Sequence, residues 1–132
     1  MKRIPWLSRT LVRGPYLILC TNEDEFKAVI KHIEYDKPYG NKWITDGANA
    51  STHTLEMDAG TVCIVCLQTK PEVTGCDIAS LLVHEAVHVF QRYCQSIGED
   101  DPSMEFEAYS IQNICSELFD EFARRIKEVK NE

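Results

Sequence analysis

The sequence predicts an α+β domain, because short strand-like runs alternate with longer helical patterns along its 132 residues. Residues 16–20, 53–57 and 61–67 are short runs of apolar or β-branched residues. Segments near 22–34, 74–95 and 103 onward carry apolar residues at helical spacing. With 44% hydrophobic and 27% charged residues, the composition predicts one domain over residues 1–132.

The first half of the chain predicts a strand, a helix and a long loop. Tyr16–Cys20 is the strand, and Thr21 or Asn22 is expected to cap a helix that ends near Glu34. Residues 35–51 are rich in Gly, Pro, Asn and Asp and are expected to form a loop. Loops of this length are often functional.

The second half predicts a hairpin followed by two helices. Residues 53–57 and 61–67 are joined by Asp58-Ala59-Gly60, which is typical of a hairpin turn. A helix is expected from Thr74 or Asp77 to about residue 95, ending at Gly98, and Ser103 is the expected N-cap of the last helix. The expected architecture is a small antiparallel or mixed sheet packed on these two helices.

Charge and hydropathy exclude several partners and locations. A net charge of -7 with a pI near 5.1 argues against nucleic acid and anionic membrane. Arg9 and Arg13 interrupt any apolar region of a signal peptide, and no apolar run approaches about 18 residues, so a cytoplasmic location is expected. The six cysteines are therefore expected to be reduced, with Cys63 and Cys66 on opposite faces of a strand.

One pentapeptide, His84-Glu85-Ala86-Val87-His88, carries the main functional signal. The surrounding helix is apolar on all sides in the sequence pattern, which predicts that it is buried. Buried histidines and a buried glutamate each need a polar partner, because an unsatisfied group costs about 1–3 kcal/mol. Something must therefore satisfy His84, Glu85 and His88.

The spacing of these residues predicts a zinc site. Residues four apart are stacked on a helix, so His84 and His88 can share one Zn²⁺ ion. Glu85 is expected to act as general base on a water at the metal. A catalytic zinc needs a third protein ligand, and Glu105 or Glu107, on the helix that follows a short acidic loop, can supply it.

HExxH followed by a glutamate on the next helix resembles the gluzincin metallopeptidases. Between about Asp77 and Asp120 the chain is also similar to small phage and prophage metallopeptidases. Both Glu105 with Ala108 and Glu107 with Ser110 match the small residue that often follows the ligand glutamate by three positions. The Glu-x-x-Ala-Asp pattern of CAAX-type membrane peptidases favours Glu105 and has Asp where this chain has Tyr109.

The resemblance implies a minimal zincin-like fold, in which an edge strand before the HExxH helix pairs with substrate. Residues 61–67 are the expected edge strand, with a plain core strand as the alternative. Tyr109 and His53 are candidates for stabilising the oxyanion. Gln91 is a candidate partner of the site or an ordinary polar helix residue.

The sequence therefore predicts a zinc-dependent peptidase with a peptide or protein as its substrate. His84 and His88 are the expected ligands, Glu85 the base and Tyr109 an auxiliary catalytic residue. The alternatives are a non-catalytic zinc-binding regulatory or protein-interaction module, and a metal-free interaction domain in which the motif is fortuitous.

Overall fold

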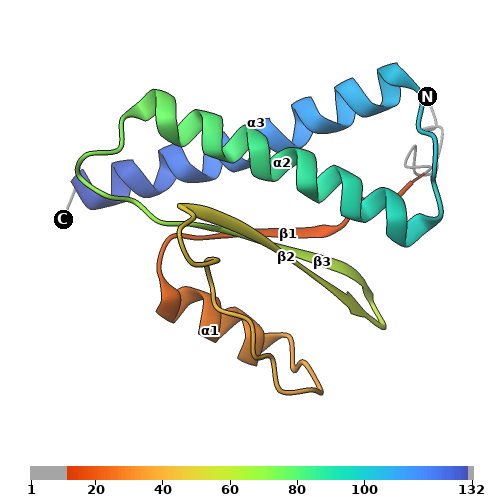
Figure 1. Ribbon diagram of the computed structural model, residues 1–132, viewed down its shortest axis with the longest axis horizontal. Coiled ribbons are helices and arrows are strands. Elements are labelled where there is room, and N and C mark those ends of the chain that lie inside the picture. Colours follow the sequence, from red (N-terminus) through yellow and green to blue (C-terminus); the bar gives the residue numbers. More distant parts are fainter. Residues whose placement is uncertain (1–11, 131–132) are drawn as a thin grey trace, which may run out of the picture.

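A three-stranded sheet lies between helices on both of its faces in the computed structural model, which describes residues 12–130 (Figure 1). In chain order the elements are β1 (Tyr16–Cys20), α1 (Glu23–His32), β2 (Ala50–Met57), β3 (Gly60–Leu67), α2 (Gly75–Ile97) and α3 (Met104–Lys130). The long helices α2 and α3 pack side by side on one face, and α1 covers part of the other. The predicted α+β class is confirmed.

The sheet has the order β1-β3-β2, so β3 is its central strand. β1 pairs with β3 in parallel and β2 pairs with it antiparallel. Of the two interpretations of residues 61–67, the core strand is confirmed and the substrate-pairing edge strand is wrong. The continuous apolar run from Val62 to Leu67 is typical of a strand covered on both faces, whereas β2 alternates polar and apolar residues. The free edge nearer α2 belongs to β2.

The side chains of β3 divide the core into two halves. Cys63, Val65 and Leu67 face α2 and α3, where they meet Leu82 and Leu118. Ile64 and Cys66 face α1 and pack with Phe26 and Leu55 on that side. Cys63 and Cys66 thus lie on opposite faces, and all six cysteines are free, as the sequence predicted.

The helix ends follow their capping residues. Thr74 and Asp77 form a capping box at the start of α2, and Gly98 ends that helix with a φ of 73°. Asn22 accepts a hydrogen bond from the backbone of Glu25, and Ser103 accepts one from Phe106. The predicted N-caps of α1 and α3 are thereby confirmed. α1 ends at His32, two residues before the predicted end.

Helix α2 is buried on one face only, so the prediction that it is enclosed on all sides is wrong. Leu82, Ala86 and Val89 are almost fully buried against the sheet, but Val83 is 41% exposed and His84 is also exposed. The sheet covers one face of the helix and α3 covers its flank, which leaves the remaining surface open to water. The prediction failed because apolar residues such as Val83 lie on this exposed surface.

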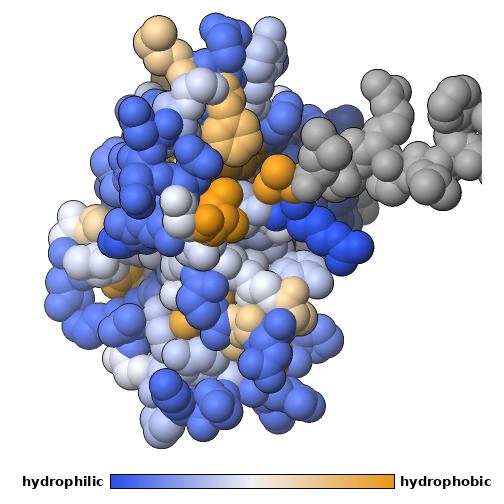
Figure 2. All heavy atoms as spheres, turned by 90° about the vertical axis from the view of Figure 1, so that its right-hand side faces the viewer, coloured by the Kyte–Doolittle hydropathy of each residue, from blue (hydrophilic) through white to orange (hydrophobic). Residues whose placement is uncertain are grey.

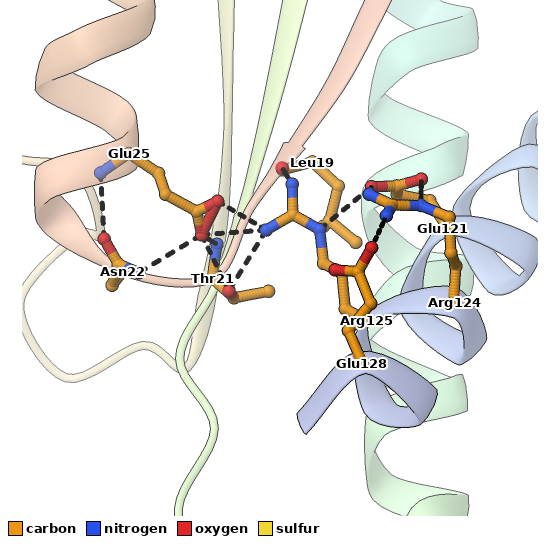
Figure 3. Close-up of polar contacts among 8 residues, drawn as sticks. All are labelled: Leu19, Thr21, Asn22, Glu25, Glu121, Arg124, Arg125 and Glu128. Carbon is orange, nitrogen blue, oxygen red and sulfur yellow. Dashed lines mark hydrogen bonds and ion pairs between the residues drawn. The ribbon is translucent and has the colours of Figure 1, made fainter. Parts of the chain in front are cut away.

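One end of α3 is tied to β1 and α1 by Arg125 (Figure 3). Its guanidinium donates to both carboxylate oxygens of Glu25, to Oε1 of Glu121 at 3.0 Å and to the backbone oxygen of Leu19 at 2.7 Å. Arg125 keeps only 22% of its side chain exposed. This half-buried cluster fixes α3 against the outer edge of β1.

Within residues 12–130, neither long helix contains a stretch apolar enough to cross a bilayer.

Candidate metal centre

The rings of His84 and His88 converge one helical turn apart on the exposed side of α2. Their centroids are 4.7 Å apart, and their Nε2 atoms approach to 3.1 Å. Two zinc–nitrogen bonds of about 2.0–2.1 Å at a tetrahedral angle would separate the nitrogens by roughly 3.3 Å. The pair therefore already has close to the spacing that one zinc ion requires.

Gln91 orients the second of these rings. The Nδ1 atom of His88 lies 3.1 Å from Oε1 of Gln91, which can only accept, so Nδ1 carries the proton. In a neutral His88 the Nε2 atom then accepts a hydrogen bond from the Nε2–H group of His84. A hydrogen bond like the one from Nδ1 to Gln91 commonly orients a metal-binding histidine and leaves its Nε2 atom available for the ion.

Glu85 points from α2 towards β2 and is only 4% exposed. Its Oε2 atom accepts a 2.5 Å hydrogen bond from the hydroxyl of Thr52, which lies near the start of β2. No described residue donates a hydrogen bond to its Oε1 atom, which is nevertheless not enclosed by protein. One carboxylate oxygen is thus anchored while the other is open to a water molecule.

A hollow of about 550 Å³ opens beside His84 and Glu85. The start of β2 forms one wall with Ala50, and α2 forms the other. Glu72 and Asp77 also line it, so this end of the site is acidic. The hydrogen bonds of its capping box lower the pKa of Asp77 and keep it ionised.

The structure does not bring Glu105 or Glu107 to the histidines. Among the described residues, no three His, Cys, Asp or Glu side chains form a group that could hold a metal. Both glutamates are exposed, and Glu107, unlike Glu105, lines a smaller hollow that Gln91 and Cys94 also line. Figure 2 shows the end of the molecule where α2 gives way to α3, and hydrophilic side chains cover most of it.

The helical register explains this difference between the two glutamates. Glu107 is exposed, but it falls on the same helical stripe of α3 as Ile114 and Leu118, which pack on the core. Glu105 is two residues earlier and is rotated well away from that stripe. Of the two glutamates, Glu107 is the one that shares a hollow with Gln91, the hydrogen-bond partner of His88.

Of the predicted oxyanion donors, His53 lies on the α1 side of the sheet, and Tyr109 is exposed on α3. Tyr109 is 62% exposed and makes no hydrogen bond with a described residue. His53 is buried on the α1 side of the sheet, where Nε2 donates to the Trp43 oxygen and Nδ1 accepts from the Tyr39 hydroxyl. Both nitrogens of His53 are occupied, so its predicted role is wrong.

Comparison of the chain with protein-family models, with curated proteins and with solved structures gives no match. The chemistry of the site must accordingly be argued from its own residues.

Sequence reasoning missed Thr52 and Arg92. Thr52 anchors Glu85, although 33 positions separate them in the chain. Arg92 lies one turn beyond His88 and lines a polar hollow along β2. The alternation of Thr52, Thr54 and Glu56 was the available signal for a polar strand face, but it did not indicate that this face meets α2.

Proposed function

We propose that the protein is a zinc-dependent peptidase of minimal zincin-like fold, with His84 and His88 as ligands and Glu85 as general base. One observation carries the proposal: a buried carboxylate stands beside two imidazoles whose Nε2 atoms are 3.1 Å apart. Neither a structural helix nor a surface ion pair needs this combination. A carboxylate next to a two-histidine zinc site is the arrangement for base-assisted hydrolysis.

When bound, zinc would acidify a water molecule towards a pKa near 7 and polarise the peptide carbonyl. Glu85 would take a proton from the water that attacks the carbonyl carbon. It would then give that proton to the departing amine as the carbon–nitrogen bond breaks. Thr52 holds one oxygen of Glu85 in place throughout, which leaves the other to carry the proton.

Glu107 is our choice for the third ligand, in preference to the Glu105 that the motif resemblance favours, and its carboxylate would have to move towards the histidines to bind the ion. Glu107 lies on the α2-facing stripe of α3 and lines the hollow beside Gln91. Carboxylate oxygen is an ordinary zinc ligand in this class of site.

The test combines metal binding with hydrolysis. Protein purified without chelators should bind about one equivalent of zinc, and His84→Gln should abolish that binding while His32→Gln, at the exposed end of α1, should not. Glu85→Gln should keep zinc and lose about 10²–10⁴-fold in kcat on a quenched fluorescent peptide library. Full activity in Glu85→Gln would overturn the mechanism.

A second pair of variants tests the third ligand. Glu107→Gln should weaken zinc binding by at least tenfold, and the matched variant Glu105→Gln should leave it unchanged. The opposite ranking would return the assignment to Glu105.

The second candidate function is a non-catalytic zinc-binding module. The observation that favours it is that the described residues hold two converging ligands rather than three. X-ray absorption of the zinc-loaded protein separates the two functions. A water in the first coordination shell supports the peptidase, and a shell closed by protein atoms supports the module.

A further inference from the structure

A second, polar hollow of about 590 Å³ runs along β2 on the other side of Glu85. Thr52 and Thr54 form its floor, Tyr39 and Lys42 line it from the loop after α1, and Arg92 lines it from α2. Thr52 is also the residue that anchors Glu85. The hollow is therefore linked to the proposed catalytic site through the hydrogen bond between Thr52 and Glu85.

The free backbone edge of β2 opens into this hollow. Asn49 accepts a backbone hydrogen bond from Gln68, and the register continues from that pair through Ser51 opposite Cys66. In an antiparallel ladder, alternate residues bond to the partner strand, so Thr52 and Thr54 turn their N–H and C=O groups away from β3. An extended peptide can pair with these groups as an added strand.

Arg92 lines the hollow along β2, and Glu85 is bound to Thr52 of the same strand. The two residues are seven positions apart on α2, a rise of about 10 Å, which corresponds to about three residues of extended peptide. A peptide paired along β2 with one bond at Glu85 would thus place a side chain near Arg92. That side chain belongs to a residue two or three positions from the bond.

The charges of the two hollows differ. The guanidinium of Arg92 donates to the neutral side chain of Gln95 at 3.1 Å and forms no ion pair with a described residue. Lys42, in contrast, is already bound by both carboxylate oxygens of Asp46. On the other side of Glu85, the hollow carries Glu72 and Asp77. A carboxylate is attracted at Arg92 and repelled at the opposite end.

We propose that Arg92 binds the carboxylate of an Asp or Glu side chain, two or three residues from the scissile bond, in a peptide paired along β2. The protein then acts on peptides that are acidic on that one side. This inference rests on the proposed peptidase function for the position of the bond. The planar guanidinium suits two parallel hydrogen bonds to a carboxylate.

The experiment uses acetylated and amidated octapeptides of Ala, Gly and Leu in which one Glu is moved through every position, each matched by a Gln peptide and a Lys peptide. The zinc-loaded wild type should show a kcat/KM about tenfold higher for Glu than for Gln at one position near the cleaved bond. The ratio should fall to about one in Arg92→Gln. In Arg92→Glu, the preference should change to Lys peptides. In the control Lys127→Gln, the ratio of Glu to Gln peptides should stay unchanged.

Fluorescence anisotropy with the same labelled peptides separates this inference from the peptidase proposal. If nothing is cleaved but Glu peptides bind about tenfold more tightly than Gln peptides, and Arg92→Gln removes the difference, the carboxylate site stands and the peptidase falls. If peptides are cleaved with no preference for Glu at any position, the site is refuted and the peptidase stands. Equal binding of Glu and Gln peptides without cleavage refutes both.

Discussion

Two arginines on neighbouring helices face opposite edges of the same sheet, and their surroundings differ. Arg125 at the β1 edge is half-buried and bound by Glu25, Glu121 and the Leu19 carbonyl. Arg92 at the β2 edge is exposed and bound only by a neutral side chain among the described residues. The β1 edge uses its charge to hold the fold together, whereas the β2 edge leaves its charge for a ligand.

Two glutamates, Glu25 at the β1 edge and Glu85 at the β2 edge, differ in the same way in the hydrogen bonds that they accept. Glu25 receives hydrogen bonds from Thr21, Asn22 and Arg125, so its carboxylate is fully engaged. Glu85 is more deeply buried, yet it has only the Thr52 hydroxyl as a donor among the described residues. A buried carboxylate with one free oxygen is poorly arranged for stability and well arranged for moving a proton.

The largest expected difference between the edges is in stability. Arg125→Met leaves Glu25 half-buried without its cation, so the free energy of unfolding should fall by about 2–3 kcal/mol. Arg92→Met, the matched change at the other edge, should alter it by less than about 0.5 kcal/mol. Urea unfolding followed by circular dichroism measures both. Equal losses would show that the two arginines stabilise the fold equally.

A smaller effect is expected at the anchor of Glu85. Thr52→Val removes the donor from a buried carboxylate and should cost about 1–2 kcal/mol, along with a loss of hydrolytic activity. Thr54→Val is the control on the same face of β2, because the Thr54 hydroxyl is buried without a partner among the described residues. That variant should unfold at the same urea concentration or a higher one. A Thr52→Val protein as stable as the wild type would show that the hydrogen bond from Thr52 to Glu85 does not stabilise the fold.

The smallest expected effect is on acid stability at the β1 edge. Hydrogen bonds from Arg124, opposed by burial and joined by those from Arg125, lower the pKa of Glu121 from 4.5 to about 2. Since the folded pKa is the lower one, its contribution to stability is present above pH 4.5. It is lost as the pH falls from about 4.5 to about 2.

Urea midpoints measured across that pH window test this contribution. The wild type should lose stability more steeply there than Glu121→Gln, which has no carboxylate to titrate at this position. The control Lys127→Gln, which removes no carboxylate, should follow the wild type. Identical slopes in wild type and Glu121→Gln would contradict the assignment.

Local patterns predicted the elements well. The start of α2 near Thr74, its end at Gly98 and the Ser103 N-cap each depend on residues within a few positions of one another. The hairpin was also predictable, because Asp58-Ala59-Gly60 is typical of a turn. In the structure, Gly60 follows the two-residue turn directly and takes a φ of 138°. Burial of α2 was not readable, because the pattern of one helix does not tell how many neighbours cover it.

Local sequence patterns did not predict the order of the strands in the sheet either. The apolar run of β3 was compatible with an edge strand or a core strand, and only pairing with β1 makes it central. That pairing joins segments more than 40 positions apart. Which strand offers its backbone to a peptide therefore follows from the tertiary structure.

The sequence by itself determined that His84 and His88 meet with Glu85 beside them, because a helix of 3.6 residues per turn stacks positions four apart. The tertiary structure decided what surrounds them. The rotation of α2 on the sheet turns Glu85 onto Thr52, leaves His84 in water and sets Arg92 over the edge of β2. The register of α3 brings Glu107 rather than Glu105 to the side of α2. These orientations come from long-range packing of the core, which no local spacing encodes.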